Sequence, residues 1–238
     1  MSFVPGNRSR VLFAATHLSG FLTEAGEDYS ANVEDTTVFT DTAKTYLPTT
    51  DDGSVSLDGL FDGTVGAIHD ALKGLKGQHD PVPYSYAPEG FATGKPAELA
   101  NILKMSYNIT AAVAGIVQLT SSGQATGGVD SGVALADLQT RTTSDDSAGH
   151  DSGGASSDGA VAHLHVTGSD GTGETLDVKV QHSSDGTTWV DLLTFTQQSG
   201  AGSDRQTVAG TVNQHVRAAW TLGGTDPSFD FAVTFARR

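Results

Sequence analysis

The stretch Phe229-Asp230-Phe231-Ala232-Val233-Thr234-Phe235 places a large apolar side chain at every second residue. Side chains alternate between the two faces of a β-strand, so this spacing predicts a strand with one buried face. The segment Ser184–Thr187, Ser-Asp-Gly-Thr, is typical of a tight hairpin turn. Four further segments show strand-like patterns: 160–166, 176–180, 189–192 and 216–222. Strands this short, separated by turns, predict a small antiparallel sandwich or barrel over residues 160–238.

The composition also favours strands over helices. The chain has 238 residues, of which 29 are glycine and only 17% are charged. Long helices are rich in Ala, Leu, Glu, Lys and Arg, whereas short strands and tight turns need Val, Thr, Gly and Asp. A chain of this length forms one large domain or two smaller ones. The predicted fold class is therefore mainly β.

The N-terminal part of the chain contains several predicted strands, among them Ala114–Thr120 and Val133–Leu135 on either side of a Gly-rich bend. Arg10–Thr16 is apolar almost throughout, which predicts a strand buried on both faces. Ser54–Phe61 begins with strict alternation, which is typical of a half-buried strand. Thr36–Thr40 is β-branched and aromatic, which favours a strand. Leu99–Ile109 fits a helix or a strand by its pattern, and we favour the strand.

One helix is predicted between Asp62, which can cap it, and Gly77, which can close it. Four apolar residues recur at spacings of three and four and therefore share one helix face: Val65, Ile68, Leu72 and Leu75. This apolar stripe should lie on a sheet. The predicted architecture of the N-terminal part is a β-sandwich or barrel with one packed helix.

Residues 142–159 consist mostly of Ser, Gly, Asp and Thr and contain almost nothing that a core could bury. This composition is typical of a linker, although the same residues also build ordered surface loops. We therefore predict three segments: a β-sandwich domain at 1–141, a linker at 142–159 and a second β-sandwich domain at 160–238.

The charge of the chain limits its partners. The formal net charge is −15, with no basic patch that could attract phosphates, so specific binding of DNA or RNA is not expected. There is no cysteine, and the sequence predicts neither a signal peptide nor a membrane anchor. We expect a soluble product that is synthesised in the cytoplasm.

Residues His150-Asp151-Ser152-Gly153-Gly154 mimic the surroundings of a serine nucleophile. Catalysis would need this serine beside a histidine base and a buried aspartate. The surroundings of His17 are the only ones that loosely resemble those of such a base. The serine motif itself lies in the least hydrophobic stretch of the chain. We therefore expect a linker here and no catalytic residues, and we do not expect an enzyme.

His163 and His165 lie two residues apart, on one face of a predicted strand. They could share a metal ion with His182 or Asp177, or with a neighbouring copy of the chain. Two histidines on a solvated face are the simpler interpretation. The sequence therefore predicts no resident metal and no cofactor.

Trp189 follows the predicted hairpin turn at Ser184–Thr187. Similar hairpins occur in sugar-binding β-sandwich modules, where an exposed tryptophan stacks on a sugar ring. A tryptophan just after a turn more often packs on its own sheet. Trp189 is thus a candidate for glycan contact, with packing as the favoured alternative.

Three stretches carry a family resemblance: residues 35–48, DTTVFTDTAKTYLP; residues 52–63, DGSVSLDGLFDG; and residues 124–135, QATGGVDSGVAL. Their order of strand, polar loop, strand and helix resembles that of siphophage major tail (tail-tube) proteins, especially those of phages that infect actinobacteria. Residues 160–238 are similar to the extra C-terminal β-domain that some of these proteins carry.

The resemblance implies a structural virion protein in the phage tail. Subunits would close into rings, commonly hexamers, and the rings would stack into a tube. Inner strands would line the channel, and the helix would pack outside the sheet. The loop from Asp41 to Asp52 would reach an adjacent ring, with these residues in contact: Asp41, Thr42, Lys44, Thr45, Tyr46, Pro48, Asp51 and Asp52.

The resemblance also implies partners. They are identical copies of the chain and other tail proteins, such as the tape measure, the tail terminator and the tail tip. Viral DNA would slide past an acidic wall without specific binding. The C-terminal domain would decorate the outside and could meet host-surface glycans.

Two other functions stay open at this point. A capsid decoration or cement protein is also acidic and β-rich, but it binds an existing shell and need not polymerise. The evidence for a carbohydrate-binding module would be Trp189 and the predicted C-terminal sandwich.

Overall fold

The computed structural model describes residues 3–75 and 80–238. The N-terminal elements are η1 (Gly6–Arg8), β1 (Arg10–Phe13), β2 (Thr16–His17), β3 (Leu22–Asp35), β4 (Tyr46–Leu60), α1 (Ile68–Gly74), β5 (Val82–Ala87), β6 (Pro96–Thr110) and β7 (Gln118–Arg141). The C-terminal elements are β8 (Asp145–Asp146), β9 (His150–Asp151), β10 (Ala160–Ser183), β11 (Val190–Thr194), β12 (Gly202–Val208) and β13 (His215–Arg237). The prediction of a mainly β fold is confirmed.

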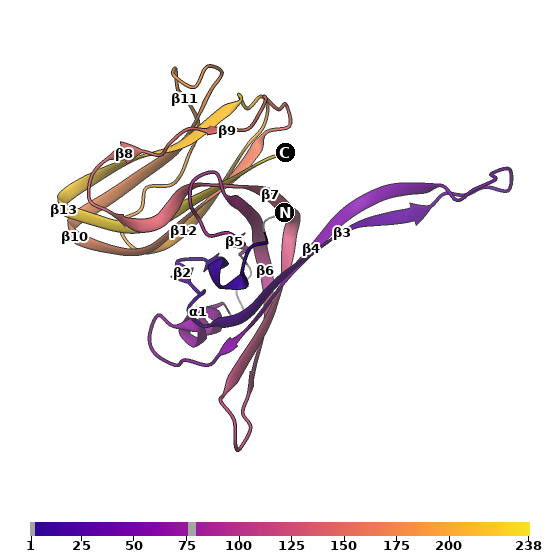
Figure 1. Ribbon diagram of the computed structural model, residues 1–238, viewed down its shortest axis with the longest axis horizontal. Helices are drawn as coiled ribbons and strands as arrows, with labels where there is room; N and C mark the ends of the chain where they lie inside the picture. Colours follow the sequence, from indigo (N-terminus) through magenta and orange to yellow (C-terminus); the bar gives the residue numbers. More distant parts are fainter. Residues whose placement is uncertain (1–2, 76–79) are drawn as a thin grey trace.

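The described strands join into one antiparallel sheet of 13 strands. Its main path is β11-β10-β13-β7-β6-β5-β1-β2, and β4 joins it at β7. β7 holds the molecule together, because its first half pairs with β4 and β6 and its second half pairs with β13. In Figure 1 the C-terminal strands form a sandwich at the upper left, while the β3–β4 hairpin leaves the body to the right. The β6–β7 hairpin points downward in the same view.

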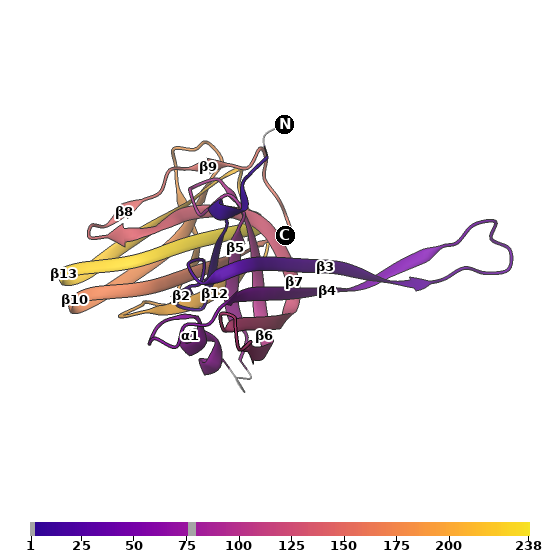
Figure 2. The same ribbon diagram turned by 60° about the horizontal axis from the view of Figure 1, so that its bottom comes forward.

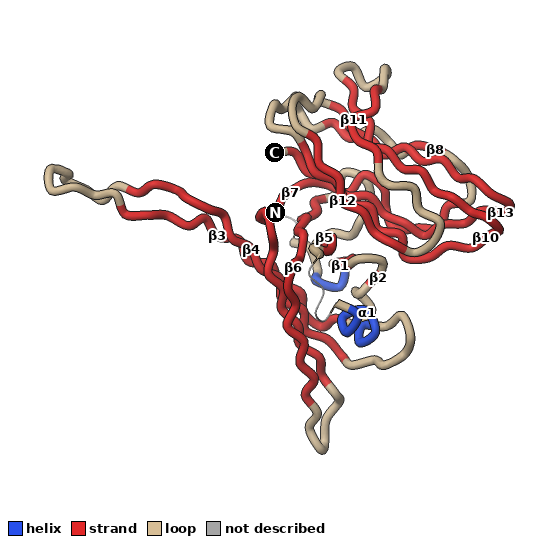
Figure 3. Tube along the Cα trace, turned by 180° about the vertical axis from the view of Figure 1, so that it is seen from behind, coloured by secondary structure: helices blue, strands red, loops and turns tan. Residues whose placement is uncertain are grey.

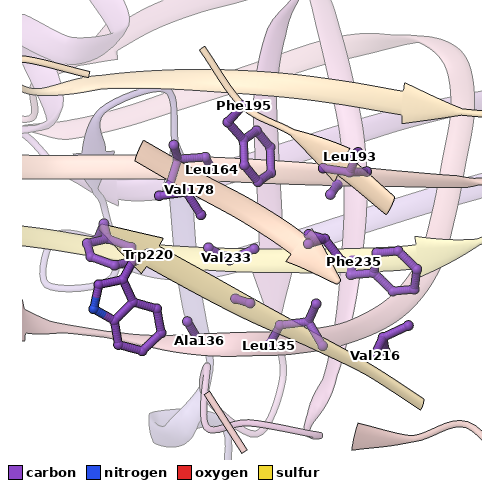
Figure 4. Close-up of a cluster of buried hydrophobic side chains, with 14 of the residues drawn as sticks. Leu135, Ala136, Leu164, Val178, Leu193, Phe195, Val216, Trp220, Val233 and Phe235 are labelled. Carbon is purple, nitrogen blue, oxygen red and sulfur yellow. The ribbon is translucent and has the colours of Figure 1, made fainter. Parts of the chain in front are cut away.

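The C-terminal sandwich has its own core. The alternating residues of β13 pair with those of β10, for example Val233 with Leu164 and Trp220 with Val178. Figure 4 shows these side chains gathered between the strands together with Leu135 of β7. The face that carries Phe229, Phe231 and Phe235 is buried as predicted, with these side chains at most 2% exposed. The prediction of a single buried face is wrong, because Ala232 and Thr234 on the opposite face are fully buried as well.

A second core lies inside the N-terminal part. Val55 and Leu57 of β4 are buried there, as the alternation of Ser54–Phe61 predicts. Val11 and Phe13 of β1 join the same cluster, whereas Leu12 between them is buried on the opposite face. The prediction that this first strand is buried on both sides is confirmed.

The predicted helix exists but is shorter than expected. α1 covers Ile68–Gly74 and buries Ile68 and Leu72 against the N-terminal core. Val65 precedes the helix and is exposed, and Ala67 rather than Asp62 occupies the N-cap position. The carboxylate of Asp62 accepts a hydrogen bond from the backbone N–H of Thr64 instead, at 2.9 Å. The predicted closing residue, Gly77, lies outside the described residues.

A third apolar cluster joins the two halves of the chain. Leu12 of β1 and Leu99 of β6 pack there with Val161 of β10 and with Ala232 and Ala236 of β13. All five side chains are at most 2% exposed. The N-terminal and C-terminal strands therefore share a buried interface in addition to the β7–β13 pairing.

The predicted linker contributes short strands to the C-terminal sheet. Within residues 142–159, β8 pairs with Ala219 and Trp220, and β9 pairs with His215 and Val216. These contacts tie the segment to β13. The division of the chain at residues 141 and 159 stays a prediction.

The expected solvated position of His163 and His165 is wrong, because both side chains are fully buried. They face the N-terminal strands. The Ser85 hydroxyl lies 3.2 Å from His163 Nδ1 and 2.9 Å from His165 Nε2. His165 Nδ1 donates a hydrogen bond to the Ala14 carbonyl oxygen at 2.7 Å. The alternation correctly placed both histidines on one face of β10. That face is covered by the N-terminal part of the chain and not by water.

The buried pair of His163 and His165 should make the folded protein less stable in acid. Burial lowers the pKa of His165 to about 4. Burial, together with the adjacent His165, also lowers the pKa of His163 well below its ordinary value. The unfolded chain takes up these protons near pH 6.5, so the free energy of unfolding should fall as the pH drops from 6.5 to 4. For His165 alone the expected loss is about 3 kcal/mol. His165→Gln should flatten this part of the urea-unfolding profile, whereas His215→Gln should leave it unchanged. An identical acid slope in His165→Gln would contradict the prediction.

Candidate assembly surfaces

β3 and β4 continue past the body as a two-stranded ribbon, residues 29–52, called the arm from here (Figures 1 and 2). β4 pairs with β7 only over Ser54–Leu60, so residues 46–52 pair with β3 alone. None of the three core clusters includes a residue of the arm. A two-stranded hairpin without further packing is marginally stable in water. The arm is therefore suited to packing on another molecule.

The loop at the end of the arm, residues 36–45, is closed by its own polar contacts. The Asp35 carboxylate accepts a hydrogen bond from the Thr37 backbone N–H at 3.0 Å and pairs with Lys44 Nζ at 3.2 Å. The Asp41 carboxylate accepts from the Val38 backbone N–H at 2.9 Å. These contacts give the loop a defined shape, visible as the tan segment at the far end in Figure 3.

Apolar side chains are exposed at this end of the arm. Phe39 is fully exposed and Val38 is 59% exposed. Tyr46 and Leu47, on β4, are each more than half exposed. The predicted strand at Thr36–Thr40 is wrong: β-branched and aromatic residues favour strands because they pack on neighbouring strands, and this loop has none.

The eight residues of the predicted inter-ring loop all lie on the arm. Asp41, Thr42, Lys44 and Thr45 belong to the loop, whereas Tyr46, Pro48, Asp51 and Asp52 lie on β4. The loop is thus shorter than predicted, since residues 46–52 are a paired strand. Sequence reasoning missed the opposite strand of the arm, including Tyr29 and Val33, and the apolar pair Val38-Phe39. That pair, in an otherwise polar stretch, was the signal that could have found the exposed end.

Glu27 occupies the base of the arm, where β3 meets the body. It is the cross-strand partner of the buried Val55. In the described structure neither Glu27 Oε1 nor the Tyr84 hydroxyl has a hydrogen-bond partner. Burial and the nearby Glu98 carboxylate raise the pKa of Glu27 to about 8. The carboxyl group is therefore mostly protonated at neutral pH.

Glu27 should make the protein less stable in mild alkali. The folded chain keeps a proton that the unfolded chain releases near pH 4.5, so stability is lost as the pH rises from 4.5 through 8. Glu27→Gln removes the ionisation and should be more stable than the natural chain at pH 8.5, by at least about 1.4 kcal/mol, the equivalent of one pKa unit. The gain should shrink at pH 5. Glu24→Gln, at an exposed site on the same strand, is the control; an equal gain there would contradict the prediction.

The sheet formed by β3, β4, β7 and β6 has one buried face and one exposed face. Leu57 and Leu119 point into the N-terminal core, and their neighbours along each strand point outward. We call the outward set the polar face: Glu24, Asp28, Ser54, Ser56, Asp58, Ser106, Asn108, Thr110, Gln118, Thr120, Ser122 and Gln124. It contains three carboxylates, and its other members in this list are hydroxyl and amide side chains. Leu60, in register with Gln118, lies on the same face and is 40% exposed. Lys104 is in backbone register with Gln124.

The residues singled out for catalysis do not form a catalytic group. His17 lies on β2 and His150 on β9, and no hydrogen bond in the described structure joins Ser152 to a histidine. The Asp151 carboxylate accepts from the Gly153 backbone N–H and from Gln214 Nε2, each at 2.8 Å. Among residues 3–75 and 80–238 there is also no group of three or more His, Cys, Asp or Glu placed to hold a metal ion.

Trp189 packs on its own sheet. The Arg217 guanidinium lies over the indole ring, 4.5 Å from its centre, and forms an ion pair with Asp146. A side chain at Gly149 would come within 3.0 Å of the ring. Arg217 therefore occupies one face of the ring that a sugar could use.

The fold and its surfaces define a β-rich protein that presents two protruding hairpins and one broad polar sheet face. The helix in its described part is not long enough to cross a membrane. No protein-family model matches the chain, and no curated protein matches it.

Several solved structures are similar to the chain at low identity. A subunit of the SPP1 tail tube matches with a TM-score of 0.45 and 14% identity, covering 53% of this chain and 78% of that chain. A subunit of the native gene transfer agent virion matches with a TM-score of 0.42 and 12% identity, covering 52% and 95%. The SPP1 Dit protein, of the hub adsorption apparatus, matches with a TM-score of 0.37 and 12% identity, covering 96% and 98%. With TM-scores below 0.5, these similarities do not establish a family or a function for the chain.

Proposed function

We propose that this chain is a structural subunit of a phage tail that polymerises into rings, and that the rings stack into the tail tube. The arm carries this proposal. It extends beyond the body, its two strands pair only with each other among the described residues, and it ends in exposed Val38 and Phe39. Such a ribbon gains stability when a second copy covers it. The resemblance of residues 35–63 to siphophage tail-tube proteins supports the same function.

The polar face is the proposed wall of the channel. Its carboxylates Glu24, Asp28 and Asp58 would repel the phosphate groups of DNA. Viral DNA would then pass without specific binding. The C-terminal strands would lie outside the tube, and rings of six subunits are the symmetry that the resemblance implies.

Electron microscopy of the purified chain in negative stain tests the proposal. Rings or hollow tubes are the expected result. A monomer that binds only to preformed capsids would support a decoration protein instead, and a monomer that binds glycans would support a carbohydrate-binding module. Either monomeric outcome overturns the proposal.

A further inference from the structure

The end of the β6–β7 hairpin is an exposed apolar segment, residues Ala111–Val117, called the apolar tip from here (Figure 1). A hydrogen bond from the Gly115 N–H to the Ala112 carbonyl at 3.0 Å closes the turn. Val113 is fully exposed and Ile116 is 70% exposed. Every residue of the segment is Ala, Val, Ile or Gly, so the tip offers a partner only an apolar surface.

The part of the β6–β7 hairpin next to the tip is also free of charge. No Asp, Glu, Lys or Arg occurs between Met105 and Val129, although the chain as a whole has 28 acidic and 13 basic residues. Copies of a chain with a net charge of −15 repel one another. An uncharged protrusion is the part of such a chain that can approach a second copy at the lowest electrostatic cost. This charge pattern favours an identical copy as the partner of the tip.

A cavity lies at the opposite end of the same two strands. β6 and β7 are paired from Thr110↔Gln118, next to the tip, to Pro96↔Val133 at the far end. Pro96, Gly132, Val133 and Phe235 form the apolar part of the lining of a hollow of about 350 Å³, called the basal cavity. The polar part of its lining consists of Glu98, Ser131, His150, Ser152 and Arg237. The tip and the basal cavity therefore lie at the two ends of the β6–β7 pairing, whose register shifts between Ala100 and Lys104.

The charged groups beside the basal cavity already have partners within the chain. The Glu98 carboxylate accepts a hydrogen bond from the Ser131 hydroxyl at 2.6 Å. The Arg237 guanidinium donates to the carbonyl oxygens of Val212 at 2.9 Å and Gln214 at 3.0 Å. The apolar part of the lining, formed by Pro96, Val133 and Phe235, is the surface that an uncharged segment of a second copy could contact.

We propose that the apolar tip of one copy docks in the basal cavity of the next copy. The contact is head-to-tail, so its two surfaces differ, and it cannot form a closed symmetric pair. Repeated along the tube axis it gives an open stack. This inference rests on the proposed function: the contact is the one that joins successive rings along the tube. It adds a second contact between rings to that of the arm.

Engineered cysteines can test the contact, because the natural chain has none. Val113 lies on the tip, and the exposed Ser131 lines the basal cavity. After mild oxidation of assembled tubes, the double variant Val113→Cys/Ser131→Cys should give a ladder of covalent multimers on a non-reducing gel. The matched control, Val113→Cys/Thr187→Cys, places the second thiol on an exposed turn of the C-terminal sandwich and should give no ladder.

The outcomes separate this inference from the proposed function. Tubes with a ladder support both. Tubes without a ladder overturn the docking contact and leave the tube function in place, whereas a chain that forms neither rings nor tubes overturns both. A second variant, Ile116→Asp, should form rings that do not stack, while Ile116→Leu should form normal tubes; long tubes of Ile116→Asp would also overturn the contact.

Discussion

Removing the end of the arm is expected to abolish tube formation while the body of the protein still folds. The variant replaces residues 32–50 by Asn-Gly, which is a favoured two-residue turn between the paired residues Ala31 and Asp51. The deleted segment contributes nothing to the three core clusters, so the melting temperature should change little. Without the segment, a neighbouring copy loses the exposed apolar end that we propose it binds.

Electron microscopy and sedimentation would measure the effect. Tubes should disappear from the shortened variant, leaving single rings or subunits. The pair Phe39→Asp and Phe39→Leu refines the test, because both change one fully exposed side chain but only the first adds charge. Full-length tubes of the shortened variant would show that the arm is not an assembly surface.

Ending the chain after Arg141 is expected to prevent stable folding of the N-terminal part. The truncation removes Val161, Ala232 and Ala236 from the cluster that covers Leu12 and Leu99. It also uncovers Leu135 and takes away β13, the partner of the second half of β7. Burying a leucine contributes about 1.5–3 kcal/mol. The truncation exposes Leu12, Leu99 and Leu135. The free energy lost by exposing them is comparable with the whole free energy of unfolding of a domain near the lower end of the typical range of about 5–15 kcal/mol.

Expression of residues 1–141 beside the full chain would test this prediction. The truncated chain should be insoluble or should melt without cooperativity in circular dichroism. If it is soluble and melts near the temperature of the full chain, residues 1–141 are an independent domain, as the sequence predicts, and the shared cluster contributes little. Leu99→Ala in the full chain is an informative companion, because it weakens the same interface without removing any strand; it should lower stability by about 2–5 kcal/mol.

Much of the local structure was readable from the sequence. Period-two spacing identified the strand that contains Val55 and Leu57 and the strand that contains Phe229 to Phe235, because the large apolar side chains of each strand lie on one face and pack into a core. The helix was recognised from Ile68 and Leu72, but its start was placed too early. Asp62 has the chemistry of an N-cap, yet it caps a turn before the helix and leaves that position to Ala67.

The candidate surfaces were only partly readable. The polar residues of the arm were identified from the family resemblance, whereas the apolar tip looked like an ordinary strand in the sequence. Ala114–Thr120 is apolar enough for a buried strand, and only the position of the β6–β7 turn shows that its first residues are exposed. Glu27 gave no sequence signal, since its raised pKa depends on its burial in the folded chain and on the nearby Glu98 carboxylate of β6.

The sequence by itself determined which residues share a strand face, because that depends on the fixed alternation of side chains along the backbone. Tertiary structure decided what covers each face. His163 and His165 are buried because β5 and the Ala14 turn lie over them, and β13 completes a sheet with β7 from a distant part of the chain. Such long-range pairings depend on the whole chain packing together, so no local pattern specifies them.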